Sequence, residues 1–217
     1  MLKNKTNIIL VIGLLGYWVI GLCGCAKREI KNIDSKGTNI VCFGDSITFG
    51  YGANAGEDYP TALSKLTNIP VINAGIDGDT STEALRRIHS DVLDREPLLV
   101  LIEFAGNDFL RKIPREKTIA NIREMVDQIQ EKGAMVAIVD ISAGVILGEY
   151  RAVFSKLARE KSAIFVPRIL SGVITNPNLK SDFIHPNGEG YKVIAEKIFR
   201  AIKPFLEQNA LLRNPKK

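Results

Sequence analysis

The 217-residue sequence lacks several motifs that carry well-known chemistries. It contains no His-Glu-x-x-His sequence and no Cys-x-x-Cys pair, so the usual zinc-binding motifs are absent. It has no glycine-rich loop of the kind that cradles phosphates, so a nucleotide cofactor is not indicated. No internal repeat or low-complexity tract is present, and the length suits one compact domain. We therefore expect a single-domain protein that works without a metal or other cofactor.

The sequence also lacks a large excess of charge of either sign. The formal net charge is +5, and it falls further if a leader carrying Lys3 and Lys5 is removed. This excess is too small to indicate a nucleic-acid partner. The one local basic cluster, Arg111, Lys112, Arg115 and Lys117, is better explained as a solvated loop and helix start than as an anion-binding surface.

The N-terminal segment resembles a bacterial lipoprotein signal. Two lysines precede the apolar run "IILVIGLLGYWVIGL", which is shorter than a spanning helix requires. The run ends at Leu22-Cys23-Gly24-Cys25, similar to a lipobox, in which Cys25 would receive a diacylglyceryl group and become the mature N-terminus. The alternative is an uncleaved N-terminal anchor. In both cases we expect the body of the protein to lie outside the cytoplasm, at the surface of a bacterial membrane. Cys42 alone would then remain free, so no disulfide is expected.

Five apolar runs alternate with helical patterns. The runs are residues 39–43, 70–73, 98–104, 134–141 and 163–166. This alternation predicts a parallel sheet covered by helices on both faces. Thr80 and Glu83 have the spacing of a capping box. Asn187 is a predicted cap for the last helix, and Gly133 is the predicted stop of a helix over 118–132.

The loops that follow the strands hold the groups needed for acyl transfer. Parallel strands bring their carboxyl ends to one edge of the sheet, where ligands bind in such folds. Ser46 follows the first run. Of only two histidines, His89 lies within a helical pattern, whereas His185 lies in a loop three residues after Asp182. Asp182 could orient one ring nitrogen while the other faces Ser46, although these residues could also serve only as turn and cap residues.

Four blocks in order resemble the Ser-Gly-Asn-His hydrolase superfamily, also called GDSL hydrolases, and most closely its bacterial acyl-CoA thioesterase I and lysophospholipase group. The blocks are Gly44-Asp45-Ser46, "GIDGDTS" with Gly78, "AGND" with Asn107, and "DFIHPN" with Asp182 and His185. The resemblance implies a three-layer α/β/α, flavodoxin-like sandwich with a five-stranded parallel sheet. The implied divisions are a signal peptide (1–24), a lipidated tether (25–37), the hydrolase domain (38–207) and a polar C-terminal tail (208–217).

The resemblance also implies a role for each block. Ser46 would be the nucleophile, His185 the general base and Asp182 its orienting partner. The oxyanion hole would comprise the backbone N–H groups of Ser46 and Gly78 and the side-chain amide of Asn107. Three residues depart from the common pattern. Ile47 replaces leucine at a packing position, and Ala105 replaces a glycine and is expected to tighten the pocket. Phe183 replaces a small residue between the acid and the base and is expected to reshape the pocket wall.

The implied activity is hydrolysis of fatty-acyl esters, such as lysophospholipids, through an acyl-enzyme intermediate. Thioesters would be cleaved by the same groups, but CoA esters are cytoplasmic and so are disfavoured as natural substrates. The alternatives are a carbohydrate O-deacetylase and a non-catalytic envelope lipoprotein with the same fold. We expect a monomer, because no dimerisation element is evident.

Overall fold

The computed structural model describes residues 29–143 and 147–214. The predicted signal peptide and the predicted lipidation site, Cys25, lie outside the described residues. Among the helices of the described ranges, none is long and apolar enough to cross a membrane.

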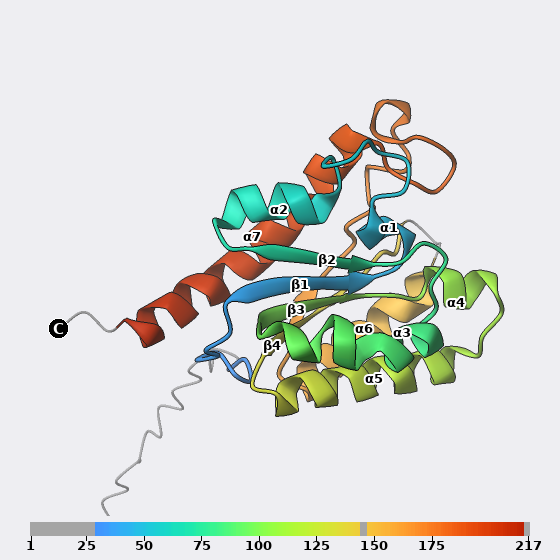
Figure 1. The fold of residues 1–217 in the computed structure, drawn as a ribbon. Coiled ribbons are helices and arrows are strands. Elements are labelled where there is room, and N and C mark those ends of the chain that lie inside the picture. The colour runs from blue at the N-terminus through green and yellow to red at the C-terminus, as the bar shows by residue number, and fades with distance from the viewer. Residues whose placement is uncertain (1–28, 144–146, 215–217) are drawn as a thin grey trace, which may run out of the picture.

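A five-stranded parallel sheet forms the centre of the fold (Figure 1). Its strands are β1 (Asn39–Gly44), β2 (Val71–Gly75), β3 (Pro97–Glu103), β4 (Met135–Val139) and β5 (Ile164–Val166). Their order across the sheet is β2-β1-β3-β4-β5, and every neighbouring pair is parallel. The five predicted runs are thus confirmed as strands, and the predicted sheet is confirmed with them.

Helices cover both faces of the sheet, as predicted. They are α1 (Ser46–Phe49), α2 (Tyr59–Thr67), α3 (Ser81–Asp91), α4 (Gly106–Leu110), α5 (Arg115–Glu131), α6 (Gly148–Glu160) and α7 (Gly188–Arg213), with short 3-10 turns η1 (Leu93–Arg95) and η2 (Pro177–Leu179). Figure 1 shows α2 and α7 on one face and α3, α5 and α6 on the other. The fold is therefore a three-layer α/β/α sandwich.

Alternating side chains of β1 build the two halves of the hydrophobic core. Ile40 and Cys42 belong to the half that packs against α2 and α7. Val41 and Phe43 belong to the half that packs against α3, α5 and α6. This alternation follows from the two-residue period of a strand, and the near-continuous apolar runs reflect burial on both faces. Cys42 is fully buried, which raises the pKa of its thiol.

The predicted helix caps are present. Thr80 and Glu83 form a reciprocal capping box at the start of α3, and the Asn187 side chain accepts a hydrogen bond from Gly190 N at the start of α7. Helix α5 begins at Arg115, three residues before the predicted start, and Gly133 lies just beyond its end with a φ of 84°. A left-handed glycine at that place closes the helix, as the sequence indicates.

The packed part of the chain extends past both predicted boundaries of the domain. Ile30 is buried although it precedes residue 38, and α7 continues to Arg213 with Asn209 buried. The Asn209 amide donates to the carbonyl oxygens of Ile33 (2.8 Å) and Ser35 (3.0 Å). The residues assigned to a tether and to a polar tail therefore hold each other against the sheet.

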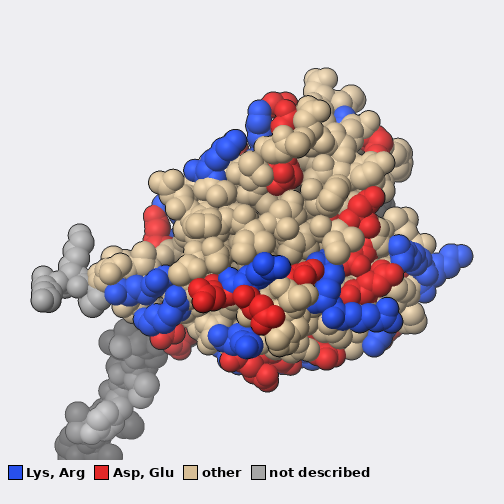
Figure 2. Space-filling view, viewed as in Figure 1, with Lys and Arg blue, Asp and Glu red and all other residues tan. Residues whose placement is uncertain are grey.

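Charges of both signs interleave on the face shown in Figure 2, most densely over α3 and α5. The basic cluster is part of this pattern. Arg111 pairs with Glu83, and Arg115 pairs with Glu149 at 2.7 Å. The cluster occupies the loop before α5 and its first turn, as predicted. His89 is mostly exposed on α3, with its Nδ1 3.0 Å from Asp94, so it is the solvent-facing histidine.

Candidate active site

Three strands end together at one edge of the sheet. Gly44, the last residue of β1, pairs with Gly75 at the end of β2 and with Glu103 at the end of β3. The loops that follow these strands carry Ser46, Gly78 and Asn107. Their arrangement at one edge is therefore a direct result of the strand register, as expected for parallel sheets.

Ser46 is presented by a tight turn from β1 into α1. Asp45 caps α1 by accepting a hydrogen bond from Ile47 N at 3.1 Å. A Cβ atom on Gly44 would lie 2.0 Å from Thr48 Oγ1, so only glycine allows this close approach of helix and strand. Ile47 is buried in the core, as predicted for its packing role. The turn leaves the Ser46 side chain at the rim of the sheet.

His185 and Asp182 reach Ser46 from the other end of the chain. His185 Nε2 lies 3.2 Å from Ser46 Oγ, and His185 Nδ1 lies 2.7 Å from Asp182 Oδ2. The second oxygen of Asp182 accepts the backbone N–H groups of Ile184 and His185. The loop therefore aligns hydroxyl, imidazole and carboxylate in the order that acyl transfer through serine uses.

The carboxylate of Asp182 is held ionised. Partial burial opposes ionisation, but the hydrogen bonds from the His185 ring and from the two backbone N–H groups outweigh it and lower the pKa of Asp182 to about 2. An ionised Asp182 accepts the Nδ1 proton of His185. Nε2 is then the nitrogen with a free lone pair, and it faces the Ser46 hydroxyl.

The loop after α1 fixes the position of the imidazole. The Tyr51 ring packs against the His185 ring in a tilted arrangement, with centroids 4.5 Å apart. The carbonyl oxygen of Tyr51 accepts a hydrogen bond from the Tyr191 hydroxyl at 2.8 Å. Gly52 lies so close to Ser181 and Pro186 that a Cβ atom there would clash. The segments that carry Ser46 and His185 are therefore packed directly against each other.

Gly78 and Asn107 lie in the loops that contact the turn carrying Ser46. Gly78 has a φ of 77°, a conformation that favours glycine. Its carbonyl oxygen accepts a hydrogen bond from Arg111 at 2.6 Å. Asn107 Nδ2 donates to the carbonyl oxygen of Asp79 at 3.0 Å and makes a longer contact of 3.3 Å with Asp45 Oδ2. These contacts tie the loops after β1, β2 and β3 to one another.

Ala105 adopts a φ of 133°, a left-handed conformation that alanine rarely occupies. The residue is buried directly before α4, so it cannot relax without moving Asn107. The consequence of replacing glycine is therefore strain in the backbone, of order 1–3 kcal/mol. The predicted tightening of the pocket by Ala105 stays a prediction. Phe183 is 81% exposed in the loop between Asp182 and His185, so its predicted effect on the pocket wall also stays a prediction.

A buried hydrogen-bond network supports α4 from below. Asp108 accepts hydrogen bonds from Ser81 N (2.9 Å) and from Thr118 Oγ1 (2.8 Å), and Asn121 donates to Ser81 Oγ. These contacts join α4 to the starts of α3 and α5. Asp108 thereby fixes the helix turn that carries Asn107.

Two carboxyl groups beneath Ser46 were not singled out from the sequence. Glu103 is fully buried at the end of β3, next to Asp45. Glu103 Oε2 accepts a hydrogen bond from Thr48 Oγ1 at 2.8 Å, while no group in the described structure donates a hydrogen bond to Oε1. Burial raises the pKa of both carboxyl groups, and their mutual repulsion raises that of Glu103 further. The sign of this buried pair in the sequence is that one charged residue, Glu103, lies near the end of the otherwise apolar run "LLVLIEF".

Arg87 is a second residue that sequence reasoning missed. Its guanidinium lies 4.5 Å from the centre of the Phe43 ring and pairs with Asp79 at 2.7 Å. It also donates to the carbonyl oxygens of Ala74 and Gly44. Arg87 thus stabilises the ends of β1 and β2 and the loop that contains Gly78. Its position in a helix with another arginine beside it gave no indication of this role.

In the described part of the chain, no group of three or more His, Cys, Asp and Glu side chains is arranged to hold a metal ion. The polar groups gathered at the edge of the sheet are instead a hydroxyl, an imidazole, a carboxylate, an amide and backbone N–H groups. These groups are suited to moving a proton and to stabilising a developing oxyanion.

Comparison with known proteins identifies relatives over most of the chain. Residues 42–193 match the model of the GDSL-like Lipase/Acylhydrolase family. The chain is 27% identical to thioesterase 1/protease 1/lysophospholipase L1 of Escherichia coli K12 over 79% of this chain and 86% of that protein. It is 30% identical to an arylesterase of Vibrio mimicus over 72% of this chain and 84% of that protein.

Solved structures show the same fold. The crystal structure of TesA superposes with a TM-score of 0.72 and 27% identity, covering 77% of this chain and 99% of that one. The esterase EstA from Pseudoalteromonas, solved with monoethylphosphonate as inhibitor, gives a TM-score of 0.71 and 28% identity over 78% of this chain and 99% of that one.

Proposed function

Because the chain belongs to the GDSL-like lipase/acylhydrolase family, we propose that it is a serine esterase that hydrolyses fatty-acyl esters such as lysophospholipids. The observation that carries this proposal is the continuous chain of contacts from Asp182 through His185 to Ser46. The relatives named as esterase, thioesterase and lysophospholipase support hydrolysis of an ester bond.

The proposed reaction proceeds through an acyl-enzyme intermediate. Ser46 Oγ attacks the ester carbonyl carbon while His185 Nε2 takes the hydroxyl proton. The carbon–oxygen bond to the alcohol then breaks, and His185 returns the proton to the leaving oxygen. Water attacks the acyl group on Ser46 with His185 as base, which releases the fatty acid and restores the enzyme. Asp182 stabilises the imidazolium in both steps.

The oxyanion is stabilised by the N–H groups of Ser46 and Gly78 and by the Asn107 amide. One Asn107 hydrogen is held by the carbonyl oxygen of Asp79 at 3.0 Å. The contact of the amide with Asp45 is long, at 3.3 Å, so the second hydrogen is the one available to the substrate oxyanion. The amide is a neutral donor, and its contribution is therefore independent of pH.

The surroundings of Ser46 favour a fatty-acyl group over an acetyl group. Phe49 follows Ser46 on α1, and Phe109 and Leu110 follow Asn107 on α4; all three side chains are exposed. Contact with a long acyl chain removes this apolar surface from water, which an acetyl group is too small to do.

We also propose that Cys25 is lipidated and that the protein is a monomer held at the extracytoplasmic face of a bacterial membrane. The support is the position of Cys25 directly after an apolar run with two preceding lysines.

The activity is tested with p-nitrophenyl esters of graded chain length and the soluble form beginning at Ala26. The described residues contain both halves of the core, so this form is expected to fold. We expect hydrolysis that increases from acetyl to medium-chain esters, and loss of activity in Ser46→Ala. Equal rates for the two proteins would refute the serine mechanism, and activity on acetyl esters alone would indicate an O-deacetylase.

A further inference from the structure

Arg87 reaches from α3 to the ends of two strands. Its Nη1 donates to the carbonyl oxygen of Ala74 near the end of β2 at 2.9 Å, and its Nη2 donates to that of Gly44 at the end of β1 at 3.2 Å. Nη1 also lies 3.0 Å from Asp91 Oδ2, one turn further along α3. The guanidinium lies over the Phe43 ring, 4.5 Å from its centre. Because two strands and its own helix all hold it, the guanidinium has a fixed position.

Asp79 is bound to this fixed group. Arg87 Nε and Nη2 both lie 2.7 Å from Asp79 Oδ2. The two side chains are largely buried, with exposed fractions of 14% for Arg87 and 8% for Asp79. A buried pair is costly to break, because the partner left behind is a charge without compensation. Arg87 therefore sets the position of Asp79.

The backbone of Asp79 in turn holds the side-chain amide of Asn107. Asn107 Nδ2 donates to the carbonyl oxygen of Asp79 at 3.0 Å. The amide is planar and carries two hydrogens on this nitrogen, so a bond made by one hydrogen fixes the direction of the other. Hydrogen bonds weaken steeply as they depart from linearity. The Asp79 carbonyl thus decides how well the second hydrogen can serve an oxyanion.

The other support of this loop lies at the surface. The carbonyl oxygen of Gly78, directly before Asp79, accepts a hydrogen bond from Arg111 at 2.6 Å. The Arg111 side chain is 52% exposed, and ionic contacts of exposed side chains hold a geometry only weakly. Gly78 itself is a glycine with a positive φ, so its backbone offers little resistance to movement. The buried contact with Arg87 is therefore the firmer restraint on the loop.

We propose that Arg87 is a positioning residue for the reaction: it holds Asp79, and through the Asp79 carbonyl it aims the Asn107 amide at the developing oxyanion. The inference rests on the proposed serine esterase function. Arg87 touches no reacting atom, and the contact that it improves is made only in the transition state. Its loss should therefore lower kcat and leave KM nearly unchanged.

The test is a double-mutant cycle on the soluble form from Ala26, with a medium-chain p-nitrophenyl ester. Arg87→Lys retains a positive charge but has one nitrogen in place of three, so it cannot bind Asp79 and both strand ends together. We expect it to lower kcat by about tenfold or more, with KM within about twofold, because small displacements of a catalytic donor are costly. In an Asn107→Ala background the same substitution should lower kcat by less than about threefold, because the amide that Arg87 aims is gone.

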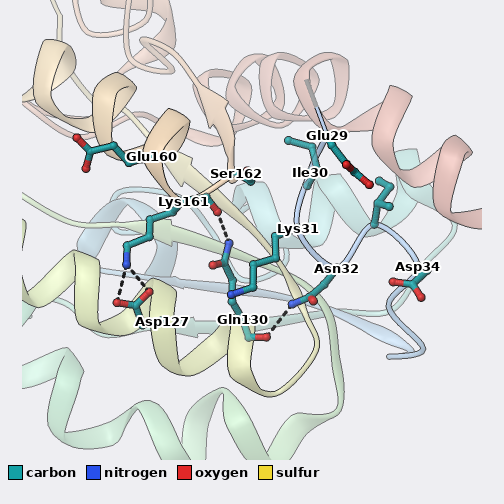
Figure 3. A pocket seen from close by; sticks show the side chains of 11 residues that line it. Glu29, Ile30, Lys31, Asn32, Asp34, Asp127, Gln130, Glu160, Lys161 and Ser162 are labelled. Carbon is teal, nitrogen blue, oxygen red and sulfur yellow. Dashed lines mark hydrogen bonds and ion pairs between the residues drawn. The ribbon is translucent and has the colours of Figure 1, made fainter. Parts of the chain in front are cut away.

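Lys161→Gln is the matched control for loss of an ion pair. Lys161 Nζ lies 2.6 Å from Asp127 Oδ1, and the Lys161 side chain is 22% exposed. Figure 3 shows this pair beside the cavity that residues 29–34 line. Lys161 precedes β5 by three residues, so the pair lies at the amino edge of the sheet, whereas Ser46 lies at the carboxyl edge. We expect Lys161→Gln to leave kcat within about twofold.

The outcomes separate positioning from a general loss of structure. Urea unfolding followed by circular dichroism gives the folded fraction of each variant, and kcat is expressed per folded protein. Asp79→Asn is a second variant that keeps the size of the side chain and removes its charge; it should also lower kcat, and much less so in the Asn107→Ala background. Equal losses from Arg87→Lys in the two backgrounds, or no loss in the original one, would overturn the inference. Failure of the original protein to hydrolyse the ester would overturn the proposed esterase function, and the inference with it.

Discussion

The buried pair Asp45 and Glu103 predicts a specific dependence of stability on pH. Asp45 accepts a hydrogen bond from Ile47 N and makes a longer contact with the Asn107 amide. No group in the described structure donates a hydrogen bond to Glu103 Oε1. The proton of the pair therefore resides on Glu103, whose carboxyl group donates to Asp45. Burial and the neighbouring Asp45 carboxylate hold the pKa of Glu103 well above its ordinary value.

The sign of the effect follows from proton linkage. As the pH rises through about 4.3, the unfolded chain loses the Glu103 proton while the folded chain retains it. Unfolding then releases one proton, so the free energy of unfolding falls by about 1.4 kcal/mol for each pH unit. This loss continues at that slope for as long as the folded chain keeps the Glu103 proton, and even one pH unit is a noticeable part of the stability of an ordinary domain.

Glu103→Gln removes this titration and retains the contacts. In the variant, the amide nitrogen of the new side chain donates to Asp45 in place of the carboxyl proton, and the amide oxygen still accepts from Thr48 Oγ1. The surrounding titratable groups, Cys42, Tyr59, Asp108, His185 and Tyr191, are unchanged. Above about pH 5 we expect the variant to gain stability relative to the original protein as the pH rises, with a slope of up to about 1.4 kcal/mol for each pH unit.

The assay is urea unfolding of the soluble form at pH 5, 6 and 7, followed by circular dichroism. Tryptophan fluorescence is unsuitable because the one tryptophan, Trp18, precedes Ala26. Glu131→Gln, at an exposed position, changes the net charge equally and should show no such trend. A stability difference between Glu103→Gln and the original protein that stays constant with pH would refute the shared proton.

Further expectations concern single residues of the site. Asn107→Ala should lower kcat by roughly a hundred- to a thousandfold with little change in KM for short esters, and an unchanged kcat would remove the amide from the oxyanion hole. The pKa of Asp182 is lowered to about 2, so its carboxylate stays charged down to low pH. Its contribution to stability is fully present above about pH 4 and is lost as the pH falls toward 2. A kcat/KM profile in which Asp182 titrates between pH 4 and 7 would contradict this. Ala105→Gly should raise stability in urea by about 1 kcal/mol through release of strain at φ 133°, and a loss of stability would show that no strain is stored there. Cys42 should resist maleimide in the folded protein and react after unfolding, since its thiol is fully buried; rapid labelling of the native form would contradict the packing.

Local patterns were sufficient for the elements of the fold. The apolar runs located the five strands to within a few residues, and the Thr80–Glu83 and Asn187 caps were identified because capping depends on neighbours three residues apart. The grouping of Ser46 with His185 followed from the topology, since loops after parallel strands share an edge.

Contacts between distant segments were not visible in these patterns. Arg87 donates hydrogen bonds to the carbonyl oxygens of Gly44 and Ala74. Glu103 accepts one from Thr48 and lies next to Asp45. These contacts join segments that meet only in the folded chain. The positive φ of Ala105 is imposed by the turn from β3 into α4, and an alanine in the sequence does not predict it. The contacts of Ile33 and Ser35 similarly depend on Asn209 of α7, which lies at the other end of the sequence.

The hydrogen bond between Ser46 and His185 joins residues 139 positions apart. Under the proposed mechanism, the serine is therefore synthesised long before the histidine that would activate it. A nascent chain would be inert toward esters until its last helix has folded against the sheet, and a chain truncated before Asp182 would remain inert. Onset of esterase activity would thus report completion of folding.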